Sequence, residues 1–326
     1  MSEALPSAKP PHFNRVAMIG IGLINGSIAR VMKRDGLADE IVGCSRREET
    51  AEEAKALGLA DRVTTDPAEA VMGADLVIIG TPPSAIGRVA KAIASTLGRD
   101  AIITDVGSIK RKVIDDVTPE LPFPGRFVPG HPVAGSEKSG PSAGFATLFE
   151  GRHCILTPTS ETDEDALETV RSFWQAAGSI VSVMTPVHHD RVLAITSHLP
   201  HLIAYSIVGT VADLEEHQQT EVLRFSAGGF SDFTRIAGSD PIMWRDIFLH
   251  NKDAVLEMLG RFTEDLNALQ RAIRWDDGDS LEALFTRTRE VRRGVIAEGQ
   301  AFSREAVKNR PTATDNRHSP QETGLG

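Results

Sequence analysis

The chain has 326 residues, of which 41% are hydrophobic and 25% are charged, a composition typical of a globular protein with room for two domains. Its formal net charge of −10 disfavours nucleic acid and anionic membranes as partners. No apolar run approaches the roughly 18 residues that a membrane span needs. The first 14 residues hold three prolines and no apolar run, which predicts a disordered extension and not a signal peptide. The two cysteines, Cys44 and Cys154, are typical of reduced structural thiols in a cytoplasmic protein.

From residue 15 to residue 185, strand-like runs alternate with helix-like runs. The predicted strands are Arg15–Gly20, Glu40–Ser45, Leu76–Gly80, Ala101–Asp105, Phe127–His131, His153–Thr157 and Ser179–Met184. The predicted helices are Leu23–Asp35, Glu48–Leu57, Ser84–Leu97, Ile109–Val117 and Glu164–Ala176. Because continuous apolar strands interleaved with helices are buried on both faces, this half predicts an α/β domain with a Rossmann-like, doubly wound parallel sheet.

Residues 186–307 show no convincing strand and predict an all-α domain. Apolar residues spaced by four and three form an a/d seam of nearly three heptads, made of Val255, Leu259, Phe262, Leu266, Leu269 and Ile273. A second apolar stripe consists of Leu281, Leu284, Thr288, Val291 and Val295. The seam is typical of helices that pack between two subunits of a homodimer, although the core of a bundle within one chain has the same spacing. Residues 308–326 are polar and rich in helix breakers, which predicts a disordered tail.

A glycine-rich turn follows the first predicted strand and opens the first predicted helix. Gly20 allows a tight turn out of the strand, and Gly22 lets a pyrophosphate approach the backbone. The phosphates are expected on the N–H groups that open the helix, at Leu23 and Ile24. The third position of the motif is Asn25 instead of glycine, which affects only the local packing of helix against strand. The turn predicts a dinucleotide cofactor, with Thr81 and Pro82 after the third strand as further contacts.

The end of the second strand bears on the choice between NAD and NADP. The chain reads Gly43-Cys44-Ser45-Arg46-Arg47 there, with no carboxylate to bind a ribose 2′-hydroxyl. Ser45 can donate a hydrogen bond, and Arg46 or Arg47 can pair with a phosphate. This pattern favours NADP+, whereas two arginines at a solvated helix start would leave NAD+ as the cofactor.

A ten-residue turn, His131-Pro-Val-Ala-Gly-Ser-Glu-Lys-Ser-Gly140, holds a histidine, a carboxylate and an ammonium among small residues. Together with the glycine turn upstream, it indicates an active site for hydride transfer. With four further motifs it makes the sequence similar to the prephenate/arogenate (cyclohexadienyl) dehydrogenase family. Those motifs are Gly20–Ser27, Thr104–Lys110, Thr196–His201 and Asp232–Trp244, and the resemblance runs from about residue 15 to about residue 302.

The resemblance implies oxidative decarboxylation of prephenate, arogenate or both, with hydride transfer to NAD(P)+, in tyrosine biosynthesis. It also implies a dinucleotide-binding domain followed by a helical dimerisation domain. No residue distinguishes prephenate, which has a keto group in its side chain, from arogenate, which has an amino group.

The resemblance also assigns roles to residues. His131 accepts the proton of the substrate hydroxyl, which suits a neutral imidazole with a pKa near the operating pH. Ser108 orients His131 and touches the hydroxyl or the nicotinamide. Arg235 binds a substrate carboxylate through two parallel hydrogen bonds, although a surface ion pair with a nearby aspartate is the alternative. The remaining predicted substrate contacts are His201, Trp244, Glu137, Ser197 and Gly228.

Three other interpretations bear on the site. A β-hydroxyacid dehydrogenase shares the layout, but it uses an interdomain lysine, and no lysine lies between Lys138 and Lys252. A non-catalytic dinucleotide-binding regulator would leave the predicted catalytic residues without a shared purpose. His198 and His201 lie one turn apart, with two further histidines upstream, but no Glu or Cys completes a zinc site, so no metal is predicted.

Overall fold

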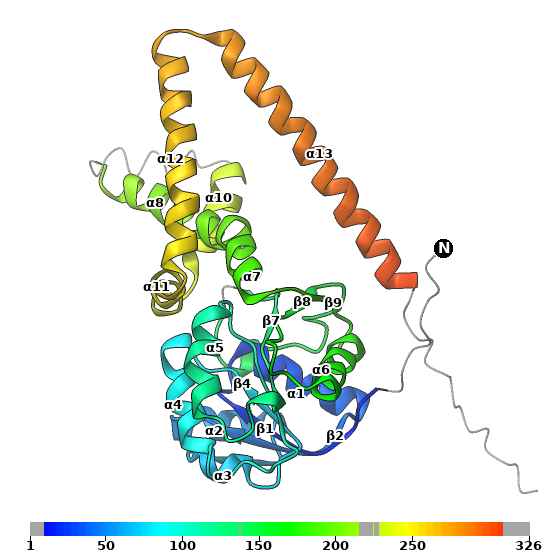
Figure 1. The fold of residues 1–326 in the computed structure, drawn as a ribbon. Coiled ribbons are helices and arrows are strands. Elements are labelled where there is room, and N and C mark those ends of the chain that lie inside the picture. Colours follow the sequence, from blue (N-terminus) through cyan, green and yellow to red (C-terminus); the bar gives the residue numbers. More distant parts are fainter. Residues whose placement is uncertain (1–9, 137, 215–223, 225–227, 309–326) are drawn as a thin grey trace, which may run out of the picture.

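The structure is a computed structural model that describes residues 10–136, 138–214, 224 and 228–308. Figure 1 shows an N-terminal α/β domain and a helical domain that extends away from it. The N-terminal domain is built on a six-stranded parallel sheet of order β3-β2-β1-β4-β5-β6. The predicted Rossmann-like architecture is therefore confirmed.

The elements of the N-terminal domain follow the predicted order closely. The strands are β1 (Phe13–Ile19), β2 (Ala38–Cys44), β3 (Arg62–Thr64), β4 (Leu76–Ile79), β5 (Ile102–Asp105) and β6 (Phe127–Val128). The helices are α1 (Leu23–Asp35), α2 (Glu48–Ala56), α3 (Pro67–Val71), α4 (Pro83–Ile93), α5 (Arg111–Val117) and α6 (Glu164–Ala176). Short 3₁₀ turns lie at Thr118–Glu120, Pro124–Arg126 and Pro141–Ala143. Sequence analysis missed β3 and α3, because elements this short show no clear hydrophobic period. The first strand also begins two residues before the predicted domain start.

The predicted strand Phe127–His131 is wrong as a single strand. The chain leaves the parallel sheet after β6 and enters a second, three-stranded sheet as β7 (Gly130–Pro132). There it pairs with β8 (His153–Leu156), which in turn pairs with β9 (Ile180–Val183). The break at Pro129, which has no N–H to donate, separates the two sheets. As a consequence, His131 lies just beyond the edge of the large sheet.

Two apolar layers cover the two faces of the large sheet. Along β1, Val16 and Met18 face the layer with α1 and α6, whereas Ala17 and Ile19 face the layer with α3, α4 and α5. This alternation is the period of two expected for a strand. Trp244 belongs to the second layer, although it comes from α11 (Pro241–His250) of the helical domain. The helical domain is thus attached to the N-terminal domain by apolar packing.

The rest of the helical domain contains α7 (Pro186–Leu193), a π-turn (Ala194–His198), α8 (Leu199–Ala212), α10 (Gly228–Thr234), a 3₁₀ turn (Arg235–Gly238), α12 (Lys252–Arg274) and α13 (Gly278–Lys308). No strand occurs among its described residues, as predicted. Helices α12 and α13 form a long arm: α12 runs away from the sheets, and α13 turns back from its far end (Figure 1). Both predicted disordered ends fall largely outside the described residues.

One helical stretch corrects the prediction about membrane spans. The elements α7, the π-turn and α8 form a single 27-residue helix, Pro186–Ala212, which contains a segment long and apolar enough to cross a membrane by length and composition. However, it also buries His189, Asp190 and His198, whose side chains make hydrogen bonds to other elements. These contacts are those of a helix that packs within the fold.

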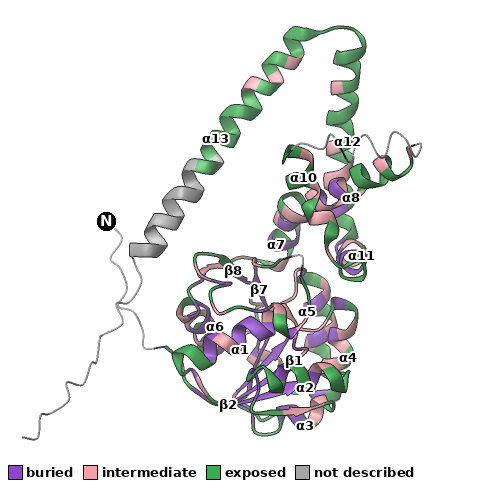
Figure 2. Cartoon of the chain, turned by 180° about the vertical axis from the view of Figure 1, so that it is seen from behind, coloured by how far each residue is buried: buried purple, intermediate pink, exposed green. Residues whose placement is uncertain are grey.

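The predicted seam on α12 is only partly covered by its own chain. Val255 at its start is buried, but Leu266 and Ile273 are 46% and 65% exposed. On α13, Val291 of the second stripe is 64% exposed, and the side chain of Val295 lies outside the described residues. Figure 2 shows that most of the arm's residues whose burial is described are exposed. A core within one chain therefore does not account for the second half of the seam.

Candidate active site

The predicted cofactor loops meet at one edge of the large sheet. Strands β1, β4 and β5 are parallel neighbours, with Ile19 opposite Ile79 and Ile79 opposite Asp105. The turns that follow these strands carry Gly20, Thr81 and Ser108. Since ligands of doubly wound sheets bind outside the carboxyl ends of the strands, this edge is the expected place for a cofactor.

The glycine turn has the geometry that a dinucleotide requires. Gly20 has a φ of 86°, and a Cβ there would lie 2.7 Å from the carbonyl oxygen of Gly80. A Cβ on Gly22, by contrast, would meet nothing within 4 Å, so the backbone faces open space. Gly22 is the N-cap of α1 and provides no side-chain cap. The N–H groups of the first turn, at Leu23 and Ile24, are thus placed to bind phosphate.

Asn25 does more than the predicted local packing. Its buried side-chain amide donates a hydrogen bond to the carbonyl oxygen of Gly20, at 2.9 Å. The space for this amide exists because residue 80 is glycine: a Cβ there would lie 2.5 Å from Nδ2 of Asn25. Asn25 therefore ties the helix to the strand ends that shape the cofactor turn.

The end of β2 keeps the features noted in the sequence. Ser45 follows the strand, its N–H bonded to the carbonyl oxygen of Thr64 at 3.3 Å. Arg46 and Arg47 are exposed, and neither guanidinium forms an ion pair within the described ranges of the chain. They are thus available to a ligand.

A buried ion pair holds the segment before His131 against the end of β5. The ammonium of Lys110 is fully buried, 2.5 Å from Oδ2 of Asp105 and 2.6 Å from the carbonyl oxygen of Gly130. The other carboxylate oxygen, Oδ1, accepts the N–H of Gly130 at 3.2 Å. Burial lowers the pKa of Lys110, while Asp105 opposes that shift. This pair fixes His131 beside the cofactor edge, and sequence analysis did not find it.

His131 is buried and bonded to another histidine. Its Nδ1 lies 2.8 Å from Nε2 of His189 on α7, and Nδ1 of His189 lies 2.8 Å from Oδ1 of Asp190. Burial, followed by the charges of His189, Lys110 and His198, lowers the pKa of His131 well below its usual value. The imidazole is therefore neutral near pH 7, as a proton acceptor must be.

The predicted orienting contact from Ser108 is not found. Ser108 is partly buried and makes no side-chain hydrogen bond within the part of the chain that the structure describes. The observed hydrogen-bond partner of His131 is His189, which lies 58 residues away in sequence. The contact of Ser108 with substrate or nicotinamide stays a prediction.

A cluster of predicted substrate residues forms in the helical domain. The ring of His201 on α8 stacks on Trp244, with centroids 3.6 Å apart and planes 22° from parallel. Nδ1 of His201 donates to the backbone carbonyl oxygen of Ser197, at 2.9 Å. Burial and the charge of Arg235 lower the pKa of His201, although the hydrogen bond to Ser197 opposes that shift. Residues predicted from separate motifs are thus brought together.

Two predicted substrate residues are not placed at this cluster by any contact. Gly228 is exposed at the start of α10, and Glu137 lies outside the described residues. The histidines considered for zinc have other contacts: Nδ1 of His198 accepts a hydrogen bond from the amide of Asn251, at 3.2 Å. Among the residues described, no group of three or more His, Cys, Asp or Glu side chains could hold a metal ion.

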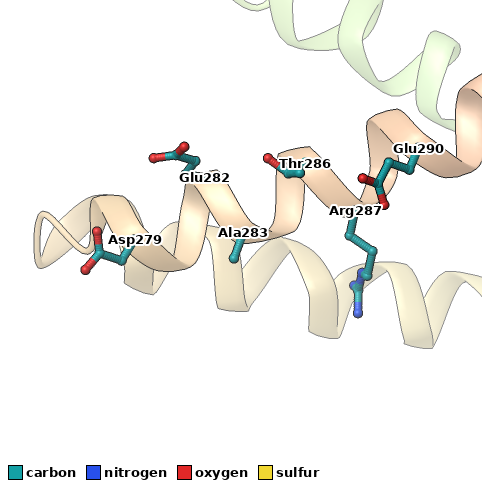
Figure 3. A pocket seen from close by; sticks show the side chains of 6 residues that line it. All are labelled: Asp279, Glu282, Ala283, Thr286, Arg287 and Glu290. Carbon is teal, nitrogen blue, oxygen red and sulfur yellow. The ribbon is translucent and has the colours of Figure 1, made fainter.

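A surface hollow on the arm is a poor candidate for the site. Figure 3 shows its lining, which comes entirely from α13 and consists of Asp279, Glu282, Ala283, Thr286, Arg287 and Glu290. The lining carries three carboxylates and one guanidinium, a balance that repels an anionic substrate. The hollow also lacks the histidine, the glycine turn and the buried contacts found at the sheet edge.

Comparison with known proteins agrees with this geometry. The fold and the site define a nicotinamide-dependent dehydrogenase with a helical second domain. Residues 28–183 match the nucleotide-binding domain of prephenate dehydrogenase, and residues 185–287 match its dimerisation domain. The chain therefore belongs to the prephenate dehydrogenase family.

The similarity extends over most of the chain. The cyclohexadienyl dehydrogenase of Zymomonas mobilis is 42% identical over 86% of this chain and 95% of its own length. The prephenate dehydrogenase of Bacillus subtilis is 37% identical over 86% of this chain and 76% of its own length. A crystal structure of prephenate dehydrogenase from A. aeolicus, in complex with hydroxyphenyl propionate and NAD+, has a TM-score of 0.80 at 36% identity. The structural match covers 88% of this chain and 100% of the A. aeolicus chain.

Proposed function

We propose that this protein catalyses the oxidative decarboxylation of prephenate, arogenate or both, with a nicotinamide cofactor as hydride acceptor. The observation that carries the proposal is a buried, neutral His131 held at the carboxyl edge of the sheet, where the glycine turn opens. The names and bound ligands of the relatives support the same substrate class.

Residues of both domains take part in the proposed reaction. A nicotinamide cofactor whose phosphates are held by the glycine turn would supply the acceptor for the hydride from C4 of the substrate ring. His131 accepts the hydroxyl proton through the ring nitrogen that does not face His189. Arg235 binds a carboxylate of the substrate, and the stacked pair of His201 and Trp244 forms an adjoining wall. Ser108 contacts the reacting hydroxyl or the cofactor.

Steady-state kinetics over two substrates and two cofactors tests the proposal. Reduced nicotinamide is followed by its absorbance with prephenate and with arogenate, each with NAD+ and with NADP+. We expect turnover with at least one of the four combinations, together with release of carbon dioxide. Cofactor binding without turnover in any combination would instead indicate a dinucleotide-binding regulator.

NADP+ is proposed as an accepted cofactor, with Arg46 as the residue that pairs with its 2′-phosphate. The support is the absence of a carboxylate from Gly43 to Arg47 and the exposed guanidinium of Arg46, which forms no ion pair with the residues that the structure describes. Arg46→Ala should lower kcat/KM for NADP+ by about 10- to 100-fold, the worth of one charge-assisted pair, and leave NAD+ nearly unchanged. Arg99→Ala, a surface arginine in the same domain, is the control. Equal losses for both cofactors would contradict the assignment.

The protein is also proposed to act as a homodimer through its helical domain. The match to a dimerisation domain supports the dimeric state, and the exposed seam on α12 supports that helix as the surface between the two subunits.

A further inference from the structure

The proposed proton acceptor and two further buried side chains form a continuous line of hydrogen bonds. His131, His189 and Asp190 are 6%, 0% and 3% exposed. The two imidazole rings meet edge to face, with centroids 5.0 Å apart and planes at 67°. The residues come from both domains, since His131 is on β7 and the other two are on α7. Sequence analysis considered His189 only as a zinc ligand.

We propose that His189 and Asp190 are positioning residues that fix the tautomer of His131 and hold the proton it removes from the substrate. The proposal rests on the proposed dehydrogenase function and adds two residues to it. Neither residue touches the substrate; each acts through His131.

The direction of the hydrogen bonds follows from the carboxylate of Asp190. Its oxygens accept the backbone N–H groups of Lys110 and Arg111, at 2.8 Å and 3.0 Å. Burial raises the pKa of Asp190, but its hydrogen bonds from His189 and from these two N–H groups outweigh burial and lower it. Asp190 is thus ionised and can only accept.

An accepting carboxylate determines both imidazole tautomers. Nδ1 of His189 must carry the proton that it donates to Asp190, so Nε2 of neutral His189 has a free lone pair. Nδ1 of His131 must then donate to that lone pair. This leaves Nε2 of His131 unprotonated, which is the form that can accept a hydroxyl proton. Without His189, the other tautomer of His131 would place a proton where the base is needed.

The same line can hold the transferred proton. As the C4–H electron pair leaves as hydride, the O–H bond breaks and its proton bonds to Nε2 of His131. The proton on Nδ1 can then shift to Nε2 of His189, which becomes an imidazolium beside Asp190. When the carboxylate leaves as carbon dioxide, its bonding pair enters the ring and reaches the oxygen. The oxygen then takes the proton back as a phenol, so the reaction releases no net proton.

A temporary positive charge at this place needs compensation. Burial disfavours the imidazolium form of His131, and so do the charges of His189, Lys110 and His198. Asp190 supplies a negative charge one ring further along the line. Since isolated buried charges are costly, this carboxylate makes proton transfer to His131 feasible at low cost.

The direct test is the tautomer of His131 in the wild-type enzyme. Ring ¹⁵N chemical shifts of histidine-labelled holoenzyme distinguish a protonated from an unprotonated nitrogen, and the His131 signals are those lost in His131→Gln. We expect a protonated Nδ1 and an unprotonated Nε2 at pH 7. A protonated Nε2 would overturn the proposal. This measurement requires no substrate and no variant of His189 or Asp190, so it is independent of whether the proposed reaction occurs.

A set of substitutions tests the effect on turnover. His189→Leu removes the acceptor for Nδ1 and should lower kcat by roughly 10²-fold or more with little change in KM, within the usual range of acid–base catalysis. His189→Gln can still accept from Nδ1 but cannot carry the proton, so it should recover about tenfold over the leucine variant. Asp190→Asn should lower kcat through loss of the negative charge.

His188→Leu and His188→Gln are matched controls, because His188 is the exposed neighbour on the same helix. Both should keep wild-type kinetics. A role in packing alone predicts equal kcat for the leucine and glutamine variants of His189, and that result would contradict the proposal. A wild-type enzyme that turns over neither substrate would reject the function and leave the tautomer measurement standing.

Discussion

The N-terminal domain and the arm of the helical domain use their apolar residues in opposite ways. The sheet domain buries them within itself, so that Val16, Leu76 and Ile78 have no exposed surface. The arm leaves Leu256, Ile273 and Phe285 more than half exposed, as the contrast in Figure 2 shows. Exposed apolar surface on this scale marks an interface. The first domain covers its own apolar surface, whereas the second leaves apolar surface that we propose a partner subunit covers.

The largest expected effect concerns the chemistry carried by the complete domain. His131→Gln removes the proton acceptor and should lower kcat by roughly 10²- to 10⁴-fold. The affinity for the cofactor should stay unchanged, because the glycine turn is not altered. Steady-state kinetics and cofactor titration by fluorescence measure the two quantities. Loss of cofactor binding equal to the loss of turnover would show that the two sites are not separable.

The second prediction tests how far the sheet domain depends on its buried ion pair. Lys110→Met leaves the carboxylate of Asp105 buried without its charged partner, which should cost about 3–5 kcal/mol of unfolding free energy. Lys112→Met breaks a partly exposed pair with Asp116 and should cost less than about 1 kcal/mol. Denaturant unfolding measures both. Similar losses for the two variants would contradict the structural role given to Lys110.

The third prediction concerns the part of the helical domain that we propose to bind substrate. Arg235→Ala should raise KM for the substrate by about 10- to 100-fold, since a hydrogen-bonded charge pair contributes about 1.5–3 kcal/mol. Its kcat should fall less than that of the His131 variant. Arg261→Ala, an exposed arginine on α12, serves as the control. An unchanged KM for Arg235→Ala would remove the carboxylate-binding role.

The fourth prediction tests whether the arm needs a partner. Ile273→Asp places a charge on the exposed half of the seam and should weaken or abolish the dimer, as sedimentation velocity would show. Asn267→Asp adds the same charge to a polar position of the same helix and should leave the dimer intact. A monomeric wild-type protein, or equal effects of the two variants, would count against the seam as the interface.

The smallest effect is expected from acidification. Burial is the main cause that lowers the pKa values of His131, His189 and His198, and that of His198 falls to about 4. Below pH 6.5 the unfolded chain therefore takes up protons that the folded chain does not, so stability decreases as pH falls from 6.5 toward 4. Thermal unfolding followed across this range should show a falling midpoint. A constant midpoint from pH 7 to pH 5 would contradict the buried, neutral state of these rings.

Much of the fold and part of the site could be predicted because their signals are local. The helix Leu23–Asp35 has the predicted bounds, since a glycine turn begins it and Gly36, at a φ of 63°, ends it. The cofactor turn and His131 were recognisable from short motifs. The run Phe127–His131 was interpreted as one strand, although the turn signal Pro129-Gly130 interrupts it, because hydrophobic periodicity does not register a change of sheet.

The amino-acid sequence alone predicted most strands and helices in their order, the glycine turn and His131 as the candidate proton acceptor. Only the tertiary structure decided what surrounds that histidine: the ion pair of Lys110 and Asp105 that holds the preceding residue, and the hydrogen bonds from His131 to His189 and from His189 to Asp190. The physical reason is distance along the chain. Periodicity and capping act over a few residues, whereas a hydrogen bond between residues 58 positions apart exists only once both domains have packed.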